Sequence, residues 1–410
     1  MKPVAVTGIG VVAPLGGDAA TFFAALLEGR SGVRRLQSRF PERLVARVGA
    51  PVDFDPARHF PAPKARMLDR VSQLALVAAA QAIEQSRGAL AGIEARRAGV
   101  FVGTSMGGSE TTDDGYHTLF AEGSDRVKPF TVLMAMTNAP AAWIALDHHL
   151  QGPALTYSTA CSSSAVAIGE AARRIAAGEA GVMVAGGAEA PLTFGTLKAW
   201  EALRTLAAED PVNPAASCKP FAKNRSGLVL GEGAAMVVLE DLDRARARNA
   251  PILAQVTGYG LTTDTSHITR PSVEGQARAM RFALEDAGLG PDAIGYINAH
   301  GTGTPANDAV ETAAIKEVFG ARAGLTPVSS TKSMHAHLLG AAGALELVVA
   351  ILAARAGVLP PTAHLEVPDP ECDLDYVANR ARRVDAVGAV MSSSFAFGGT
   401  NAVLIAQVAG

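Results

Sequence analysis

The two halves of this sequence resemble each other, which restricts the folds that the chain can adopt. Five segments of the first half recur in the same order in the second half, at a period of about 200 residues. The pairs are 4–10 with 252–260, 71–86 with 274–289, 98–108 with 294–304, the segment after Cys161 with 341–357, and 180–191 with 386–399. We expect two similar halves related by a pseudo-dyad, with loops from both halves meeting in one central site.

Within each half, apolar strand-like runs alternate with helix-like segments, an order that is typical of α/β folds. Asp18 is a predicted N-cap of the first helix, because aspartate accepts hydrogen bonds from the free N–H groups of a helix start. The helix predicted after Cys161 has one apolar face, formed by Ala165, Ile168, Ala172 and Ile175. We place the join in the charged segment 241–250, which predicts domains at 1–245 and 246–410.

Composition excludes several classes of protein. Of the 410 residues, 49% are apolar and 18% are charged, so a large core is expected and disorder is not. A net charge of −3 provides no overall basic field for a nucleic acid. The three cysteines are widely spaced without a CxxC, which argues against disulfides and zinc sites. Because we find no apolar run of about 18 residues, we predict no membrane span and a cytoplasmic protein.

Cys161 follows a strand predicted at 154–160 and precedes an alanine-rich helix. A helix N-terminus carries roughly half a positive charge and free N–H groups. Both favour the reactive thiolate, and the N–H groups could also bind an oxyanion. The alternative interpretation is an inert cysteine in the core, where most free cysteines are found. Cys161 alone does not decide between the two.

Two histidines strengthen the first interpretation. His300 lies directly after a predicted strand, and His337 lies just before the helix that corresponds to the one after Cys161. The repeat therefore predicts that a thiol and two imidazoles come together at the pseudo-dyad. His335 lies beside them. We predict no metal site, because His335 and His337 have no acidic neighbour in sequence.

Two further motifs match known sites only in part. GTSMG at 103–107 matches the nucleophile elbow of hydrolases, with Ser105 as nucleophile, but a polar, glycine-broken segment follows it instead of an apolar helix. GIGVVA at 8–13 matches a dinucleotide-binding loop, but Pro14 and the next glycines delay the helix that would bind a pyrophosphate.

Seven ordered motifs, spread nearly from end to end, resemble those of the β-ketoacyl-acyl-carrier-protein synthases, and most closely the elongating, type II-like condensing enzymes. They are VAVTGIGVVAPLG, YSTACSSS, VMVAGGAEAP, KPFAKNRSGLVLGEGAAMVVLE, NAHGTGTPANDAVE, SSTKSMHAHLLGAAGALE and SSFAFGGTNAVL. The resemblance implies a thiolase-like fold of duplicated αβαβα layers. It also implies pairing as a homodimer, or as a heterodimer with a related subunit.

The resemblance implies a decarboxylative Claisen condensation with malonyl-acyl-carrier protein. Cys161 would carry the acyl chain, and His300 and His337 would assist loss of CO2 and stabilise the enolate. Lys332 and Glu346 would form a buried pair near the histidines, with Lys332 tuning His337, although a purely structural pair is the alternative for Glu346. No metal or other cofactor is implied, since the phosphopantetheine arm arrives on the acyl carrier protein.

Other matched positions imply binding roles. Thr302 and Thr304 would hydrogen-bond the phosphopantetheine arm, or alternatively cap a turn. Phe397 would gate the acyl pocket, and its backbone N–H would form an oxyanion hole with that of Cys161. Lys64 and Arg66 would dock the acidic carrier protein, although an ordinary surface charge cluster is an equal alternative.

The chain also departs from the family pattern. His335-Ala336 replaces a usual Thr-Gly, and Ala396 replaces a glycine between Phe395 and Phe397, where alanine would resist a positive φ. A specialised pathway to polyenes or polyketides therefore fits as well as fatty-acid synthesis. The rival functions are a non-catalytic partner of the chain-length-factor type, which lacks the cysteine, and a thiolase or initiating synthase that uses coenzyme A. An initiating synthase pairs one histidine with an asparagine, whereas this chain has two histidines.

Overall fold

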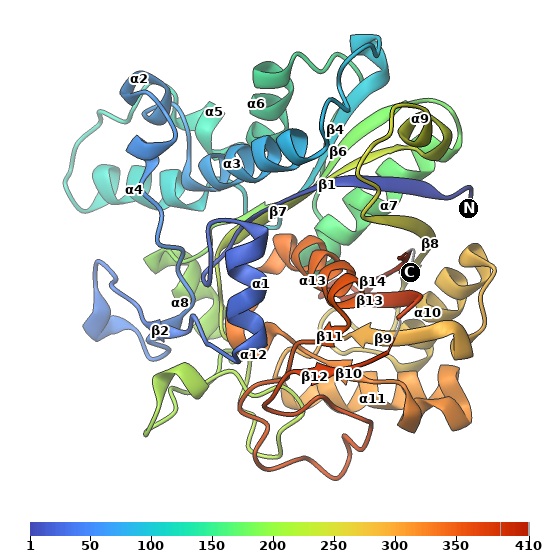
Figure 1. The fold of residues 1–410 in the computed structure, drawn as a ribbon. Helices are drawn as coiled ribbons and strands as arrows, with labels where there is room; N and C mark the ends of the chain where they lie inside the picture. Colours follow the sequence, from blue (N-terminus) through green and yellow to red (C-terminus); the bar gives the residue numbers. More distant parts are fainter. Residues whose placement is uncertain (386, 409–410) are drawn as a thin grey trace.

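The computed structural model describes residues 1–385 and 387–408. A ten-stranded sheet runs through it in the order β10-β9-β13-β14-β8-β1-β7-β6-β4-β5 (Figure 1). The first half supplies β1 (Val4–Val12), β4 (Ala98–Gly103), β5 (Ala154–Tyr157), β6 (Val182–Glu189) and β7 (Gly233–Asp241). The second half supplies β8 (Ala254–Thr263), β9 (Ile294–Asn298), β10 (Val328–Ser329), β13 (Ala389–Phe395) and β14 (Thr400–Gln407).

The two halves of this sheet have the same strand order when they are followed outward from the antiparallel β1–β8 pair. β8, β14, β13, β9 and β10 then correspond to β1, β7, β6, β4 and β5. The segments paired in the sequence repeat occupy these equivalent positions, although the one at 386–399 begins at residue 386, outside the described residues. The predicted α/β fold with a duplicated architecture is confirmed.

Helices form three layers around the two half-sheets. α3 and α6 cover the outer face of the first half, α7 and α13 lie between the halves, and α10 and α11 cover the second half (Figure 1). The helices are α1 (Ala19–Leu27), α2 (Ala62–Ala65), α3 (Arg70–Gln85), α4 (Ser109–Phe120), α5 (Thr131–Ala135), α6 (Ala139–His148), α7 (Ser163–Ala176), α8 (Phe194–Ala202), α9 (Leu242–Ala247), α10 (Val273–Ala287), α11 (Pro305–Phe319), α12 (Lys332–His335) and α13 (Ala342–Ala356). Short strands β2 (Arg34–Arg35) and β3 (Val48–Gly49) pair with each other, as do β11 (Val358–Leu359) and β12 (Arg382–Arg383).

Close glycine contacts join the outer helices to the sheet. A Cβ at Gly8 would lie 1.9 Å from the Ala82 carbonyl oxygen of α3, so β1 approaches that helix too closely for any side chain. Gly260 of β8 has the equivalent contact, 2.0 Å from the Ala279 carbonyl oxygen of α10. The glycines of the GIG motif therefore serve strand–helix packing, which explains its partial match to a dinucleotide loop.

Helix α13 lies in the central layer and is buried on nearly all sides. The segment Leu339–Ala356 has the length and hydropathy of a membrane span, but 83% of it is buried inside the fold. The sequence-based expectation was that no uninterrupted apolar run reaches about 18 residues, and it holds, because Glu346 and Arg355 interrupt this segment. A helix that is mostly apolar and buried on nearly all sides, as α13 is, is a core helix.

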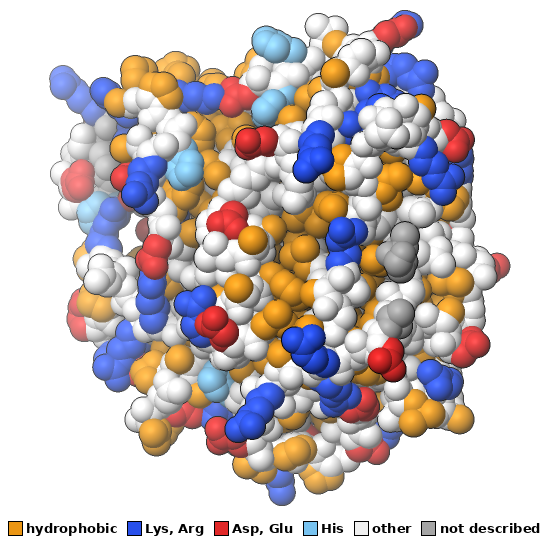
Figure 2. Space-filling view, in the orientation of Figure 1, with side chains coloured by type: hydrophobic (Ala, Val, Ile, Leu, Met, Phe, Trp, Pro, Cys, Tyr) orange, Lys and Arg blue, Asp and Glu red, His pale blue; other side chains and the backbone are white. Residues whose placement is uncertain are grey.

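Other sequence-based expectations have mixed outcomes. Asp18 caps α1 by accepting a hydrogen bond from the Thr21 N–H at 2.8 Å, as predicted. The polar segment after Ser105 forms helix α4, which the sequence did not predict. On the face shown in Figure 2, basic and acidic side chains are interspersed, in keeping with the small net charge.

Candidate active site

Cys161 lies in a 3-10 turn, Ala160–Ser162, between β5 and α7. The preceding Ala160 has a φ of 50°, a left-handed conformation that alanine rarely adopts and that sharply turns the chain before the cysteine. The side chain of Cys161 is only 5% exposed, yet it lines a pocket whose outer end includes the exposed residues Ile268 and Arg270. The thiol is therefore buried and accessible through this pocket.

The second half brings two histidines to this thiol. His300 follows β9, and His337 lies between α12 and the 3-10 turn Leu339–Ala341. The Cys161 Sγ and one ring nitrogen of each histidine all lie within 4.8 Å of one another. The two rings meet edge to face, with centroids 5.3 Å apart. The structure thus brings together the three residues that the repeat predicted to meet.

Hydrogen bonds determine where both imidazoles hold their protons. The Leu339 N–H donates to Nδ1 of His337 at 3.2 Å, and the Lys332 ammonium lies 3.4 Å from Nδ1 of His300. Because both donors occupy Nδ1, each neutral ring carries its proton on Nε2. The Nε2 of His337 is buried and has no hydrogen-bond partner among the described residues. Each ring can therefore offer an N–H donor to a substrate.

Both histidines are neutral at physiological pH. Burial, followed by the positive charge of Lys332, holds the pKa of His300 and of His337 well below the ordinary value. Such groups donate hydrogen bonds without being strong acids.

The thiol of Cys161 differs from our expectation of a resting thiolate. Burial raises its pKa to about 11, against the opposing effects of Lys332 and of hydrogen bonds from the N–H groups of Phe397 and Cys161. Cys161 directly precedes Ser162, the N-cap of α7, and burial outweighs the favourable effect of this helix N-terminus on the thiolate. The thiol is protonated at rest and must lose its proton as it reacts.

Lys332 and Glu346 are fully buried and form an ion pair. The Lys332 ammonium also donates to the His300 carbonyl oxygen at 2.5 Å. Lys332 was expected to tune His337, and its positive charge does lower the pKa of that histidine, while its direct contact is with His300. Burial raises the pKa of Glu346 to about 7, which the lysine partly opposes.

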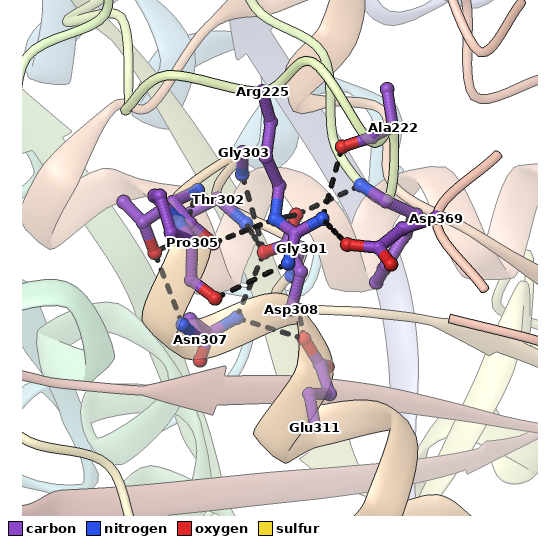
Figure 3. Close-up of polar contacts among 12 residues, drawn as sticks. Ala222, Arg225, Gly301, Thr302, Gly303, Pro305, Asn307, Asp308, Glu311 and Asp369 are labelled. Carbon is purple, nitrogen blue, oxygen red and sulfur yellow. Dashed lines mark hydrogen bonds and ion pairs between the residues drawn. The ribbon is translucent and has the colours of Figure 1, made fainter. Parts of the chain in front are cut away.

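Hydrogen bonds hold the loop after His300 rigidly in place (Figure 3). Glu311 accepts from the N–H groups of His300 and Gly301, both at 2.7 Å. Asp308 accepts from the N–H of Thr302 at 3.1 Å, and Arg225 donates to the Thr304 carbonyl at 3.1 Å (Figure 3). Sequence reasoning missed these supporting residues. Their signal was the pair of acidic residues on one face of the helix that follows the loop.

The predicted substrate-binding residues line the same pocket. Thr302 and Thr304 share a hydrogen bond of 2.9 Å, and Thr304 also caps α11. Phe397 lines the pocket and stacks on Trp200, with centroids 6.0 Å apart. Our expectation that Ala396 would resist a positive φ does not apply, because the left-handed residues of this loop are Gly398 (φ 84°) and Gly399 (φ 81°).

The structure does not bring Lys64 and Arg66 to this site. Both belong to α2 and its C-terminal cap, far from α11 in Figure 1, and neither is among the described residues that line the pocket. The Lys64 charge is matched by Asp147 at 2.5 Å. Within one chain, the geometry gives no support to the predicted docking role.

Ser105 does not form a hydrolase site with these histidines. Its hydroxyl donates to the Ala160 carbonyl at 3.0 Å, and so supports the turn before Cys161. Its backbone N–H donates to the buried Glu189.

Comparisons with known proteins agree with this geometry. The family described as beta-ketoacyl synthase, N-terminal domain, matches residues 1–245, and the corresponding C-terminal domain matches 253–366. The chain is 45% identical to nodulation protein E of Rhizobium meliloti (strain 1021) over 98% of both chains. It is 43% identical to 3-oxoacyl-[acyl-carrier-protein] synthase 2 of Coxiella burnetii, again over 98% of both.

Two solved structures have a TM-score of 0.91 and cover 100% of both chains. One is the ishigamide ketosynthase/chain length factor, at 35% identity. The other is the AntDE:AntF complex, described as a type II PKS acyl-carrier protein with its ketosynthase bound to the hexaketide, at 29% identity.

Proposed function

Because this chain belongs to the β-ketoacyl synthase family and is an elongating condensing enzyme, we propose that Cys161, His300 and His337 carry out its acyl transfer and decarboxylative condensation. The observation that supports this proposal is the meeting of one thiol with one ring nitrogen from each of two neutral imidazoles, all within 4.8 Å of one another. The thiol comes from the first half of the chain, and both imidazoles come from the second.

The first step loads the acyl chain. The Cys161 sulfur attacks the thioester carbonyl of an acyl-carrier protein, and the backbone N–H groups of Cys161 and Phe397 stabilise the resulting oxyanion. The carbon–sulfur bond to the carrier breaks. The proton that Cys161 gives up passes to the pantetheine sulfur, which leaves as a thiol. Both N–H groups oppose the rise in the pKa of the thiol, as expected of groups that stabilise negative charge at this position.

The second step generates the nucleophile. The bond between the malonyl carboxylate and its α-carbon breaks, CO2 leaves, and the electron pair moves into the thioester carbonyl to form an enolate. The Nε2–H groups of His300 and His337 donate to the enolate oxygen. Their low pKa values keep them from protonating the carbanion.

The third step forms the new carbon–carbon bond. The enolate carbon attacks the acyl carbonyl on Cys161, and the same oxyanion hole stabilises the intermediate. The bond to the Cys161 sulfur then breaks, which releases a β-ketoacyl chain on the carrier protein. The free thiolate recovers a proton. Loss of CO2 drives the sequence, and we propose that no metal or redox cofactor takes part.

Lys332 supports these steps by holding His300. It donates to the His300 carbonyl and to Nδ1, so it fixes both the ring orientation and the Nε2–H tautomer. Glu346 compensates its charge. Thr302, Thr304 and Phe397, which line the pocket, would contact the phosphopantetheine arm and the acyl chain.

The partner that delivers substrates is an acyl carrier protein, as in the AntDE:AntF complex. Arg270 and Ile268, exposed at the pocket entrance, are better placed to meet it than Lys64 and Arg66. We place the enzyme in the cytoplasm. Its pathway is either fatty-acid synthesis or a specialised polyene or polyketide route.

The enzyme would act as a dimer, with a copy of itself or a related subunit. β5 is an edge strand of the sheet with exposed residues, which leaves backbone groups open to pairing. Exposed apolar side chains also occur on β5 and on segment 116–146, which includes α6, a helix in contact with β5. They are Tyr116, Phe120, Val127, Phe130, Val132, Leu133, Met136, Leu146 and Leu155.

A Cys161→Ala variant tests the proposed nucleophile. Incubated with acyl-carrier protein, the wild-type enzyme should gain the mass of one acyl group, and the variant should gain none and form no β-ketoacyl product. Intact mass spectrometry measures both, with Cys218→Ala as a matched control at another buried cysteine. Acyl transfer that survives in Cys161→Ala, or that is lost equally in Cys218→Ala, would refute the assignment.

A further inference from the structure

His335 is a third imidazole near the site, with no role in the steps above. It is fully buried at the end of α12, and it is not among the described residues that line the pocket. Both of its ring nitrogens are occupied. Nδ1 lies 2.7 Å from the Ala336 carbonyl oxygen, and Nε2 lies 3.0 Å from the Thr331 hydroxyl.

These contacts define the proton position on His335. A carbonyl oxygen only accepts hydrogen bonds, so Nδ1 carries the proton and donates it to Ala336. Nε2 then accepts from the Thr331 hydroxyl. Burial lowers the pKa of His335 to about 3, so the ring stays neutral in the folded protein. With both nitrogens engaged, His335 has no donor left for a substrate.

Ala336, whose carbonyl oxygen accepts the hydrogen bond from His335, has an unfavourable backbone conformation. Ala336 has φ 60° and ψ −169°, a region that glycine adopts readily and alanine does not. Its side chain nevertheless belongs to a small apolar cluster with Val48, Cys218 and Val229. The alanine side chain therefore packs well at this position, whereas its backbone conformation needs stabilising contacts from neighbouring groups.

The next residue is His337. Its N–H donates to the Val229 carbonyl at 2.7 Å, and its carbonyl accepts from the Gly231 N–H at 2.9 Å. The peptide that joins Ala336 to His337 is thus held at its N–H by the backbone of another segment. The hydrogen bond found at its carbonyl oxygen comes from the His335 side chain.

We propose that His335 is a positioning residue, whose Nδ1–H holds the strained Ala336–His337 peptide so that the His337 imidazole faces Cys161. This inference rests on the proposed catalytic role of His337. It explains how the sequence His335-Ala336 is compatible with an ordered His337.

Two substitutions separate the contacts of the two ring nitrogens. In His335→Asn, the amide nitrogen occupies the place of Nδ1 and can still donate to the Ala336 carbonyl. In His335→Gln, the longer side chain reaches only the place of Nε2 and keeps the Thr331 contact. Thr331→Val is the matched control, because it removes the hydroxyl partner of Nε2 with little change of shape.

The test measures Cys161 acylation by intact mass and condensation with malonyl-carrier protein in a single turnover. We expect His335→Asn and Thr331→Val to retain condensation, and His335→Gln to lose it by about 10- to 100-fold, the cost of a misplaced catalytic group. Acylation should persist in all three. Adding Ala336→Gly to His335→Gln should restore most of the lost rate, because glycine needs no support in this conformation.

The inference is overturned if His335→Gln and His335→Asn behave alike, if Thr331→Val is as impaired as His335→Gln, or if glycine gives no rescue. Equal losses of acylation and condensation, with a lower melting temperature, would mean a purely structural role and would also overturn it. His337→Ala separates this inference from the proposed function. If His337→Ala condenses normally, the catalytic assignment fails, whereas an impaired His337→Ala beside a normal His335→Gln refutes only the positioning role.

Discussion

Of three neighbouring imidazoles in this protein, two carry their proton on Nε2 and one carries it on Nδ1. His300 and His337 receive hydrogen bonds at Nδ1, and so keep the proton on Nε2. His335 donates from Nδ1 to a carbonyl. The residue types were visible in the sequence, whereas the tautomers depend on a lysine and on backbone groups that only the fold brings near. The same holds for Lys332, whose contact with His300 sequence spacing did not reveal.

Buried neutral histidines make stability depend on pH. In the unfolded chain a histidine has a pKa of about 6.5, whereas in the folded protein that of His335 is lowered to about 3. As the pH falls below the pKa of the unfolded chain, the unfolded state binds a proton that the folded state does not bind. The free energy of unfolding therefore decreases. Each such histidine accounts for about 1.4 kcal/mol per pH unit within that window.

Urea denaturation at about pH 7 and about pH 5 checks this dependence. Between these two pH values His335→Asn should lose up to about 2 kcal/mol less stability than the wild-type protein, because one titrating group is gone. Equal losses in the two proteins would show that His335 is not held neutral by the fold.

Secondary-structure elements and their repeat were well predicted where the signal was local. The repeat could be recognised in β1 and β8 from their glycine spacing, and in α3 and α10 from their apolar faces. Both signals are periodic features of the chain itself. Helix α4 was missed because its residues are mostly polar, with few buried side chains to mark one face. The 3-10 turn at Cys161 was also missed, because a turn and a helix start have similar compositions.

Gly8→Ala should destabilise the protein by about 1–3 kcal/mol or more, because its Cβ would overlap the α3 backbone, which cannot move aside as a side chain could. Gly17→Ala is the matched control. No atom lies within 4 Å of its Cβ position, and the change should stay within about 0.5 kcal/mol. Denaturant unfolding of both variants measures the difference. A Gly8→Ala protein as stable as the control would contradict the close approach of β1 to α3.

At the scale of the whole molecule, the edge strand β5 exposes backbone groups and side chains that we propose to lie in a dimer interface. The exposed apolar residues proposed for this interface are spread over about 40 positions of the chain, and their exposure became visible only in the fold. The same limit applied to carrier docking. The Lys64 and Arg66 charges were visible in the sequence, but the pocket entrance is formed by residues from distant segments.

The double variant Phe130→Asp with Leu133→Asp should convert the dimer into monomers, because it places two charges in the proposed interface. Both residues are exposed in the single chain, at 46% and 59%. Light scattering after size-exclusion chromatography gives the mass directly. Val212→Asp is a control at a more exposed position, 91%, outside the residues proposed for this surface, and should remain dimeric. A monomeric wild-type protein, or a double variant that stays dimeric, would exclude this interface.

The division of labour between the thiol of one half and the imidazoles of the other is tested by rapid-quench mass spectrometry of His337→Ala. Supplied with acyl-carrier protein and then with malonyl-carrier protein, the variant should accumulate acyl-Cys161 at the wild-type rate. It should release β-ketoacyl product at least about 100-fold more slowly, as expected on loss of a donor to developing negative charge. Product release at the wild-type rate, or a failure to acylate Cys161, would contradict this account.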